Sequence, residues 1–202
     1  MIGVHPIKSY LFNNNIKVNV FFKIGVNSKM NLPYQFHKEA FAQTIPFFNN
    51  IFISNVSFKT MQAFRKGGHS RPISSILAHE MIHVLYEDRY GWRKTRLHNW
   101  LDTSEKSKYG FIWKEEGYAE YIAGGKGINF VEGLKILDGR GNTTYNSIAV
   151  EYFKYWLAIK YLLEIKHLSM DQVVYTKLDF DTVLQQAVLA FNQLQNMKRN
   201  LY

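Results

Sequence analysis

The chain contains no cysteine, and only 4 of its 202 residues are proline. The absence of cysteine excludes disulfide bonds, thiolate ligands for zinc and cysteine nucleophiles. It does not select a cellular compartment, since a cysteine-free chain is compatible with reducing and with oxidising surroundings. Any metal bound by this chain would therefore depend on nitrogen and oxygen ligands.

The sequence also has no long apolar run, and residues 1–8 show no visible signal-peptide pattern. No stretch approaches the roughly 20 consecutive apolar residues of a membrane-spanning helix. Residues 1–8 do not combine a charged start with an apolar run, so we expect no signal peptide. The cytoplasm is then the default location, and the compartment stays open.

The strongest chemical signal in the sequence is the stretch His79-Glu80-Met81-Ile82-His83. On a helix, residues four apart lie on one face, so both imidazoles can bind one metal ion. Zinc would lower the pKa of a bound water to about 7, and Glu80 could take its proton as the water attacks a carbonyl. With this chain's composition the pattern arises by chance in roughly one such chain in a hundred. The spacing predicts metal-assisted hydrolysis, most often of a peptide bond.

The residues around this motif have the periodicity of an amphipathic helix. Pro72 precedes the pattern and Gly91 follows it. Apolar residues recur between them at spacings of three and four, at Ile73, Ile76, Leu77, Met81, Val84 and Leu85. We therefore predict that both histidines lie on one helix, and we prefer a metal site to two unrelated histidines on a solvated helix face.

A catalytic zinc needs three protein ligands and a position for water, so the sequence must supply another donor. The metzincin arrangement would need glycine and histidine where this chain has Tyr86 and Arg89. A better candidate lies in residues 113–121, which read Trp-Lys-Glu-Glu-Gly-Tyr-Ala-Glu-Tyr. This segment resembles the W-x-x-E-G-x-A-E-Y block of the gluzincins, as in the aminopeptidase N family and many small thermolysin-like, peptidase MA-like bacterial proteins.

The resemblance implies roles for two carboxylates of this block. In that superfamily the glutamate before the glycine is the third zinc ligand, which corresponds to Glu116, and a later carboxylate that orients a ligand histidine corresponds to Glu120. The spacing agrees, because residues four apart share a helix face. Glu115 points about a quarter turn away, and we interpret it as a solvated acid favoured by the helix dipole. The segment between His83 and Glu116 is longer than in the aminopeptidases, which leaves the cleft shape open.

His98 is the alternative third ligand, because imidazole also suits zinc and this residue lies between the two motifs. No known spacing surrounds it, and we interpret it as a surface histidine beside Trp100. The remaining histidines stand alone in the sequence and are treated as ordinary surface or partly buried side chains. They are His5, His37, His69 and His167.

Hydrolysis at zinc also requires a donor for the oxyanion of the tetrahedral intermediate. In gluzincins a tyrosine or histidine from the later helical region supplies it. Tyr145 lies near the start of a helical pattern over residues 145–166, and its surroundings loosely match the tyrosine-bearing segment of the aminopeptidases. Tyr145 is therefore our predicted oxyanion donor, with Tyr152 as its neighbour. Ordinary aromatic packing is an equally open interpretation in a chain with 13 tyrosines.

The periodicity of the chain places strands early and helices late, which predicts an α+β fold. Residues 16–24 and 50–54 have the pattern of strands. Helical patterns cover residues 35–43, 57–64, 112–123, 130–137, 145–166, 169–176 and 180–197. The gluzincin resemblance implies a small mixed N-terminal sheet with the active-site helix and a mostly helical C-terminal half.

The gluzincin resemblance gives this fold a more specific form. It implies a single zincin-like catalytic domain over residues 1–202, with the sheet and metal helix in about 1–92 and a helical lobe in about 111–202. In that fold an edge strand of the sheet binds an extended peptide through main-chain hydrogen bonds. We predict residues 51–54 as that edge.

The formal charge of +9 supports a different interpretation. Residues 89–100 interleave basic and aromatic side chains, which would suit phosphates and stacked bases. A basic loop can equally keep the domain soluble or favour acidic substrates, so we do not expect nucleic acid to be a partner.

The combined patterns predict a zinc-dependent (Zn2+) metallopeptidase of the gluzincin type acting on a peptide or protein. The alternative is a catalytically inactive binding module on a zincin-like fold, including one associated with nucleic acid. The substrate, the choice between endopeptidase and aminopeptidase, and the oligomeric state stay open. The candidate site residues are His79, His83 and Glu116 as metal ligands, Glu80 as general base, Glu120 as support for a ligand, and Tyr145 as oxyanion donor.

Overall fold

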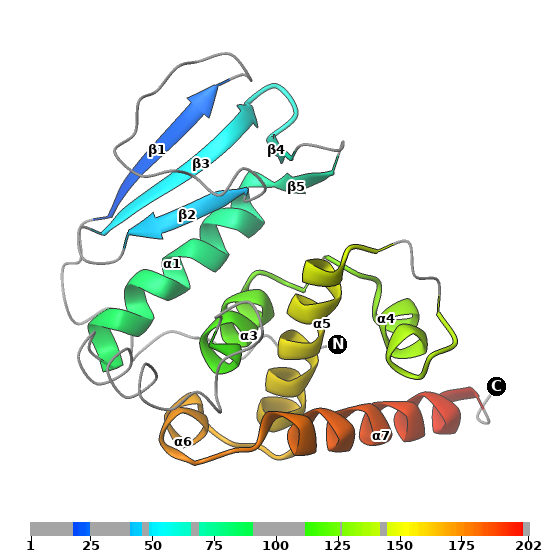
Figure 1. The fold of residues 1–202 in the computed structure, drawn as a ribbon. Helices are drawn as coiled ribbons and strands as arrows, with labels where there is room; N and C mark the ends of the chain where they lie inside the picture. The colour runs from blue at the N-terminus through cyan, green and yellow to red at the C-terminus, as the bar shows by residue number, and fades with distance from the viewer. Residues whose placement is uncertain are drawn as a thin grey trace. The chain divides into compact units, whose positions relative to one another are not determined.

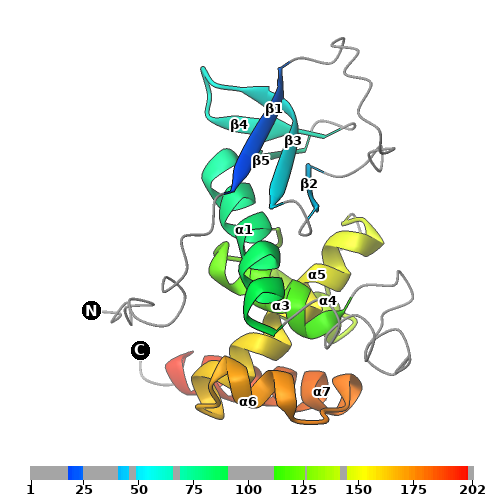
Figure 2. The ribbon, with the colours of Figure 1, turned by 90° about the vertical axis from the view of Figure 1, so that its left-hand side faces the viewer.

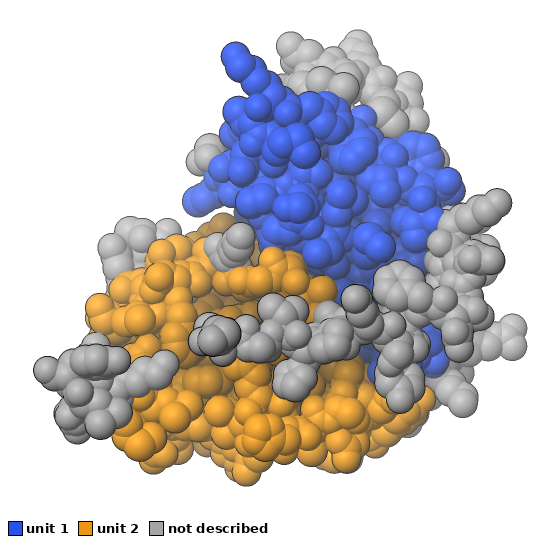
Figure 3. All heavy atoms as spheres, turned by 180° about the vertical axis from the view of Figure 1, so that it is seen from behind, with its two compact units in different colours: residues 1–95 blue, residues 96–202 orange. Residues whose placement is uncertain are grey.

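A computed structural model of the chain describes residues 18–24, 41–45, 49–65, 69–90, 112–125, 127–141 and 145–199. The chain divides into two compact units, residues 1–95 and 96–202, which Figure 3 shows in blue and orange. The described part of the first unit is a sheet with one long helix, and that of the second is mostly helical (Figure 1). The predicted α+β class with a small mixed sheet is confirmed.

The first unit contains a five-stranded mixed sheet in which β3 (Asn50–Ser57) is the central strand. β1 (Asn19–Ile24) pairs with β3 in parallel, and β2 (Ala42–Ile45) pairs with it in antiparallel orientation. Both strands pair with residues 50–53 of β3, so they flank that segment on opposite sides. β4 (Gln62–Phe64) pairs with the end of β3, and β5 (Ser70–Pro72) pairs with β4.

The predicted edge strand, residues 51–54, lies in the middle of this sheet, so that prediction is wrong. Ile51 and Ile53 are 0% and 1% exposed, as expected for an apolar run in a central strand. The local pattern does not encode which strands pair beside it. Within the described residues, β2 pairs with β3 alone, and it packs against α1 (Ile73–Tyr90).

The helix predicted for residues 57–64 is also wrong, because a turn at residues 58–61 joins β3 to β4 there. Phe58 and Met61 have the spacing of a helical face, but their side chains are 47% and 57% exposed. Met61 has a left-handed backbone with φ of 52°, which ends any helical run. The helix predicted over residues 35–43 fails where it is described, since Ala42 and Gln43 belong to β2, and residues 35–40 lie outside the described residues.

α1 packs against the sheet and completes the core of the first unit (Figure 2). The helix has the boundaries that the sequence pattern predicts, and Ile73, Ile76 and Val84 form its contribution to the core. The strands contribute Ile51, Ile53, Val56 and Ala63. This apolar stripe determines which face of α1 turns toward the sheet.

The second unit is organised around α5 (Ser147–Lys160). α3 (Trp113–Ile122) and α7 (Phe180–Arg199) pack against α5 (Figure 1). The other helical elements are α4 (Phe130–Leu137), the π-helical turn η3 (Tyr161–Ile165) and α6 (Met170–Tyr175). The helices of this unit are those predicted, except that the last turn of the 145–166 pattern is a π-helix.

Polar side chains cap several of these helices and explain where they begin. Asn129, Asn146 and Ser169 accept hydrogen bonds from main-chain N–H groups in the first turns of α4, α5 and α6. At α6 the cap is reciprocal, because Gln172 also accepts from the N–H of Ser169. No helix in the described part of the chain is long and apolar enough to cross a membrane.

Candidate metal centre

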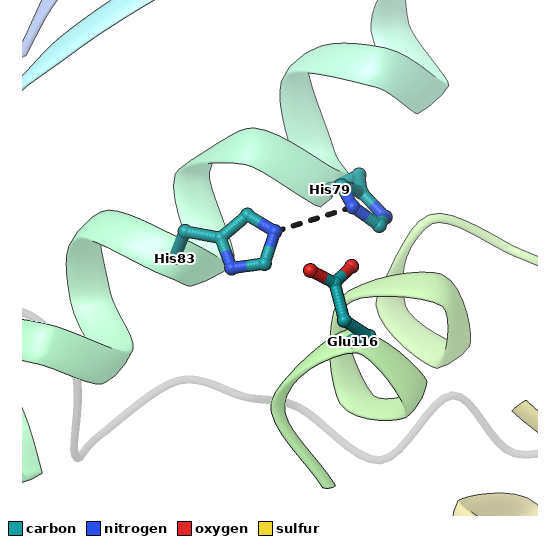
Figure 4. Close-up of side chains that lie close together, drawn as sticks. All are labelled: His79, His83 and Glu116. Carbon is teal, nitrogen blue, oxygen red and sulfur yellow. Dashed lines mark hydrogen bonds between the residues drawn. The ribbon is translucent and has the colours of Figure 1, made fainter. Parts of the chain in front are cut away.

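α1 carries His79 and His83 one turn apart, with the two rings directed toward each other (Figure 4). Their Nε2 atoms are 3.2 Å apart and the ring centroids are 5.0 Å apart. Two zinc–nitrogen bonds of about 2.0–2.1 Å at a tetrahedral angle would hold the nitrogens about 3.3 Å apart. The separation of the two Nε2 atoms therefore fits two ligands of one ion. It equally fits a hydrogen bond in which one neutral imidazole donates to the other.

Two adjacent residues of the motif, His79 and Glu80, are buried. His79 and Glu80 are 7% and 8% exposed, and both continue the stripe that Ile76 begins one turn earlier. Burying ionisable side chains costs free energy unless other groups compensate their charge. A divalent cation bound by the histidines would provide that compensation for Glu80.

Strand β2 contributes a contact to the motif that the sequence analysis missed. The Oγ1 atom of Thr44 donates to Oε2 of Glu80 at 2.5 Å, and the same oxygen lies 3.2 Å from the main-chain carbonyl of Glu80. Both residues belong to the first unit. No local signal could reveal this contact, because 36 positions of sequence separate the two residues.

In the second unit, α3 carries the carboxylates of the predicted ligand block. Glu116 and Glu120 lie one turn apart on this helix, as predicted, with Glu116 half-buried and Glu120 only 5% exposed. The interpretation of Glu115 as a solvated acid is wrong, because its side chain is 7% exposed. Its neighbour Lys114 is 2% exposed and donates to the main-chain carbonyl of Thr176. The first turn of α3 is thus embedded in protein, where the helix dipole does not decide exposure.

His79 and His83 on α1 and Glu116 on α3 are the candidate metal ligands among the described residues (Figure 4). Two imidazole nitrogens and a carboxylate oxygen are a donor set that suits zinc. The imidazoles belong to the first unit and the carboxylate to the second, so their joint binding of one ion is a proposal.

The remaining candidates have less support from the structure. Tyr145 precedes α5 and is 36% exposed, and Tyr152 lies on α5 with its ring 6.3 Å from that of Tyr155. A role for either tyrosine at the oxyanion stays a prediction. His98 lies outside the described residues, as do His5 and His37. His69 and His167 are exposed.

The basic and aromatic segment, residues 89–100, is described only at its start. The guanidinium carbon of Arg89 lies 5.7 Å from the centre of the Tyr90 ring. Tyr90 itself is buried, at 6% exposed, so it offers no stacking surface for a base.

No protein-family model, curated protein or solved structure matches this chain. The case for a function therefore depends on the chemistry of the residues themselves.

Proposed function

We propose that this protein is a zinc-dependent peptidase of the gluzincin type, with His79, His83 and Glu116 as metal ligands and Glu80 as general base. The observation that carries the proposal is the 3.2 Å separation of the two Nε2 atoms on α1, with the buried Glu80 carboxylate next to His79 in the chain. The alternative donor His98 lies outside the described residues. The α+β first unit, with α1 against the sheet, supports a zincin-like fold.

The chemistry requires one proton to move twice. A bound zinc ion would polarise the scissile carbonyl and lower the pKa of a water molecule to about 7. Glu80 accepts a proton from the attacking water and then passes it to the leaving amine as the peptide bond breaks. Thr44 engages Oε2 of Glu80, so we assign both transfers to Oε1. Glu120 is assigned the support of a ligand imidazole, which fixes its tautomer.

The substrate class follows from the strand beside the metal helix. β2 packs against α1, and within the described residues it pairs only with β3, which makes its other side our candidate for main-chain pairing. We propose that an extended peptide pairs with this side of β2, in place of the segment 51–54 that the sequence suggested. A peptide bound there would pair with the same strand that carries Thr44, and Thr44 contacts the general base Glu80.

The decisive experiment measures bound metal and peptide cleavage on the same preparation. The purified chain is stripped with a chelator, reloaded with zinc, and assayed for bound metal and for cleavage of a mixture of unstructured peptides. We expect one zinc ion per chain and cleavage that disappears on stripping and returns with zinc. A chain that binds no zinc, or that binds zinc without cleaving any peptide, would overturn the proposal.

A further inference from the structure

The Thr44 hydroxyl holds the Glu80 carboxylate from a strand that is distant in sequence. Thr44 pairs with Ile51 of β3, which places it in the second half of the four-residue strand β2. In a strand, successive side chains point to opposite faces, so Thr44 and Ala42 turn to one face and Gln43 to the other. The contact with Glu80 shows that the Thr44 face is the one turned toward α1.

A hydroxyl group can donate only one hydrogen bond, so Thr44 must choose between two acceptors of Glu80. A threonine hydroxyl has one proton, and two acceptors of Glu80 are within reach, at 2.5 Å for Oε2 and 3.2 Å for the main-chain carbonyl. The carboxylate is the closer and the more strongly accepting partner. Its engagement fixes the rotation of the Glu80 carboxyl group, which otherwise turns freely about its last bond.

We propose that Thr44 is a positioning residue for Glu80, which holds Oε2 so that Oε1 is directed to the proton of the attacking water. This inference depends on the proposed peptidase function. It assigns β2 a double role: the strand would bind the substrate main chain on one side and orient the general base through a side chain. The position of the peptide and the orientation of the base would then be set by one structural element.

Two substitutions separate the hydroxyl from the shape of the side chain. Thr44→Val keeps the branched shape and removes the donor, and Thr44→Ser keeps the donor and removes a methyl group. A hydrogen bond to a charged group contributes enough to predict a fall in kcat of about tenfold to hundredfold for Thr44→Val. We expect KM and zinc content to be unchanged in this variant, and Thr44→Ser to retain kcat within about threefold.

A double variant tests whether Thr44 acts through Glu80. If it does, adding Thr44→Val to Glu80→Gln causes no further fall in the residual kcat. If Thr44 only joins β2 to α1, the two losses multiply and KM rises, which would overturn the inference. Equal kcat values for the wild type and Thr44→Val would also overturn it.

A measurement on the metal-free protein tests the hydrogen bond between Thr44 and Glu80 without an activity assay. Infrared difference spectra of metal-free wild type and Thr44→Val should show a shift of a carboxylate stretching band, and the shift should be absent when both proteins carry Glu80→Gln. A shift that persists with Glu80→Gln, or no shift at all, contradicts the hydrogen bond. If the band shifts but the zinc-loaded wild type cleaves no peptide, the peptidase proposal fails, and the positioning role fails with it while the contact itself stands.

Discussion

Gly117 on α3 lies directly against the main chain of Tyr155 on α5. A methyl group added at Gly117 would meet the carbonyl oxygen of Tyr155 at 2.5 Å and a side-chain carbon of Ile159 at 2.7 Å. Because the oxygen belongs to the backbone of a buried helix, it cannot move aside without displacing α5. The glycine that follows Glu116 is thus explained by helix packing inside the second unit.

The Gly117→Ala variant should be destabilised, because the two helices must separate to admit the methyl group. We expect the free energy of unfolding to fall by about 1–3 kcal/mol, the usual cost of overpacking. Chemical denaturation followed by circular dichroism measures it. Gly127→Ala is the matched control, since nothing lies within 4 Å of a methyl group there, and its effect should stay within about 0.5 kcal/mol. Equal midpoints for the two variants would contradict the packing argument.

Alanine at His79 or at His83 should abolish tight zinc binding, because each substitution leaves at most two of the three proposed ligands. Isothermal titration calorimetry with zinc measures the loss, and circular dichroism checks that α1 is retained. His69→Ala is the control, since His69 is exposed and precedes β5. If His69→Ala weakens zinc binding as much as the other two, the assignment to the pair on α1 is wrong.

Glu116→Gln tests whether the second unit supplies the third ligand. An amide oxygen is neutral and binds zinc more weakly than a carboxylate, so we expect the zinc affinity to fall by about tenfold or more. Glu132→Gln on α4 is the control, because Glu132 faces Lys135 at 3.8 Å on the same helix. Unchanged affinity in Glu116→Gln, combined with a loss in a variant of His98, would favour the rival ligand.

Glu80→Gln should separate metal binding from catalysis. The substitution removes the base and leaves the proposed ligands, so zinc content should be unchanged while kcat falls about a hundredfold or more. Metal analysis and peptide cleavage on one preparation give both values. Turnover equal to the wild type would exclude Glu80 as the general base.

The pH dependence of stability at high pH should include a contribution from Tyr121. Burial, and next the Glu164 carboxylate that accepts from the phenol at 3.1 Å, raise the pKa of Tyr121 to about 12. A pKa raised by folding means that the neutral phenol is favoured in the folded state. This stabilisation is complete below pH 10 and is lost as the pH rises from the ordinary value of 10.0 through about 12.

The titration can be assigned to this one tyrosine by difference. The absorbance of tyrosinate in the wild type minus that in Tyr121→Phe isolates the Tyr121 transition, and Glu164→Gln should move its midpoint toward 10. A difference curve already centred at 10 in the wild type would show that neither burial nor Glu164 raises the pKa of Tyr121 in solution.

Helices of this chain were predictable because their signals are local. α1 has the predicted apolar period, and α4 and α6 begin after side chains that cap them. The spacing of His79 and His83 on α1 is also a local signal, because it spans a single helical turn. The prediction that one helix presents both histidines therefore agrees with the structure.

The features that the sequence did not reveal depend on contacts between distant residues. Strand order cannot be read from a single strand, so the central segment of β3 was mistaken for an edge. The burial of Glu115 depends on what packs around the first turn of α3. Thr44 gains its importance only when β2 pairs with β3 and lies against α1.

The number of residues in the π-helical turn η3 sets the direction in which the following side chains point. Glu164 lies in this turn, where it accepts from Tyr121 and from Lys160. Removing one of residues 161–163 should restore an ordinary α-helix and rotate the residues that follow, Glu164 included, by about 100°. We expect a chain shortened in this way to keep a continuous helix and to turn Glu164 away from Tyr121, so the direction in which the following segment leaves the helix depends on the π-helical turn.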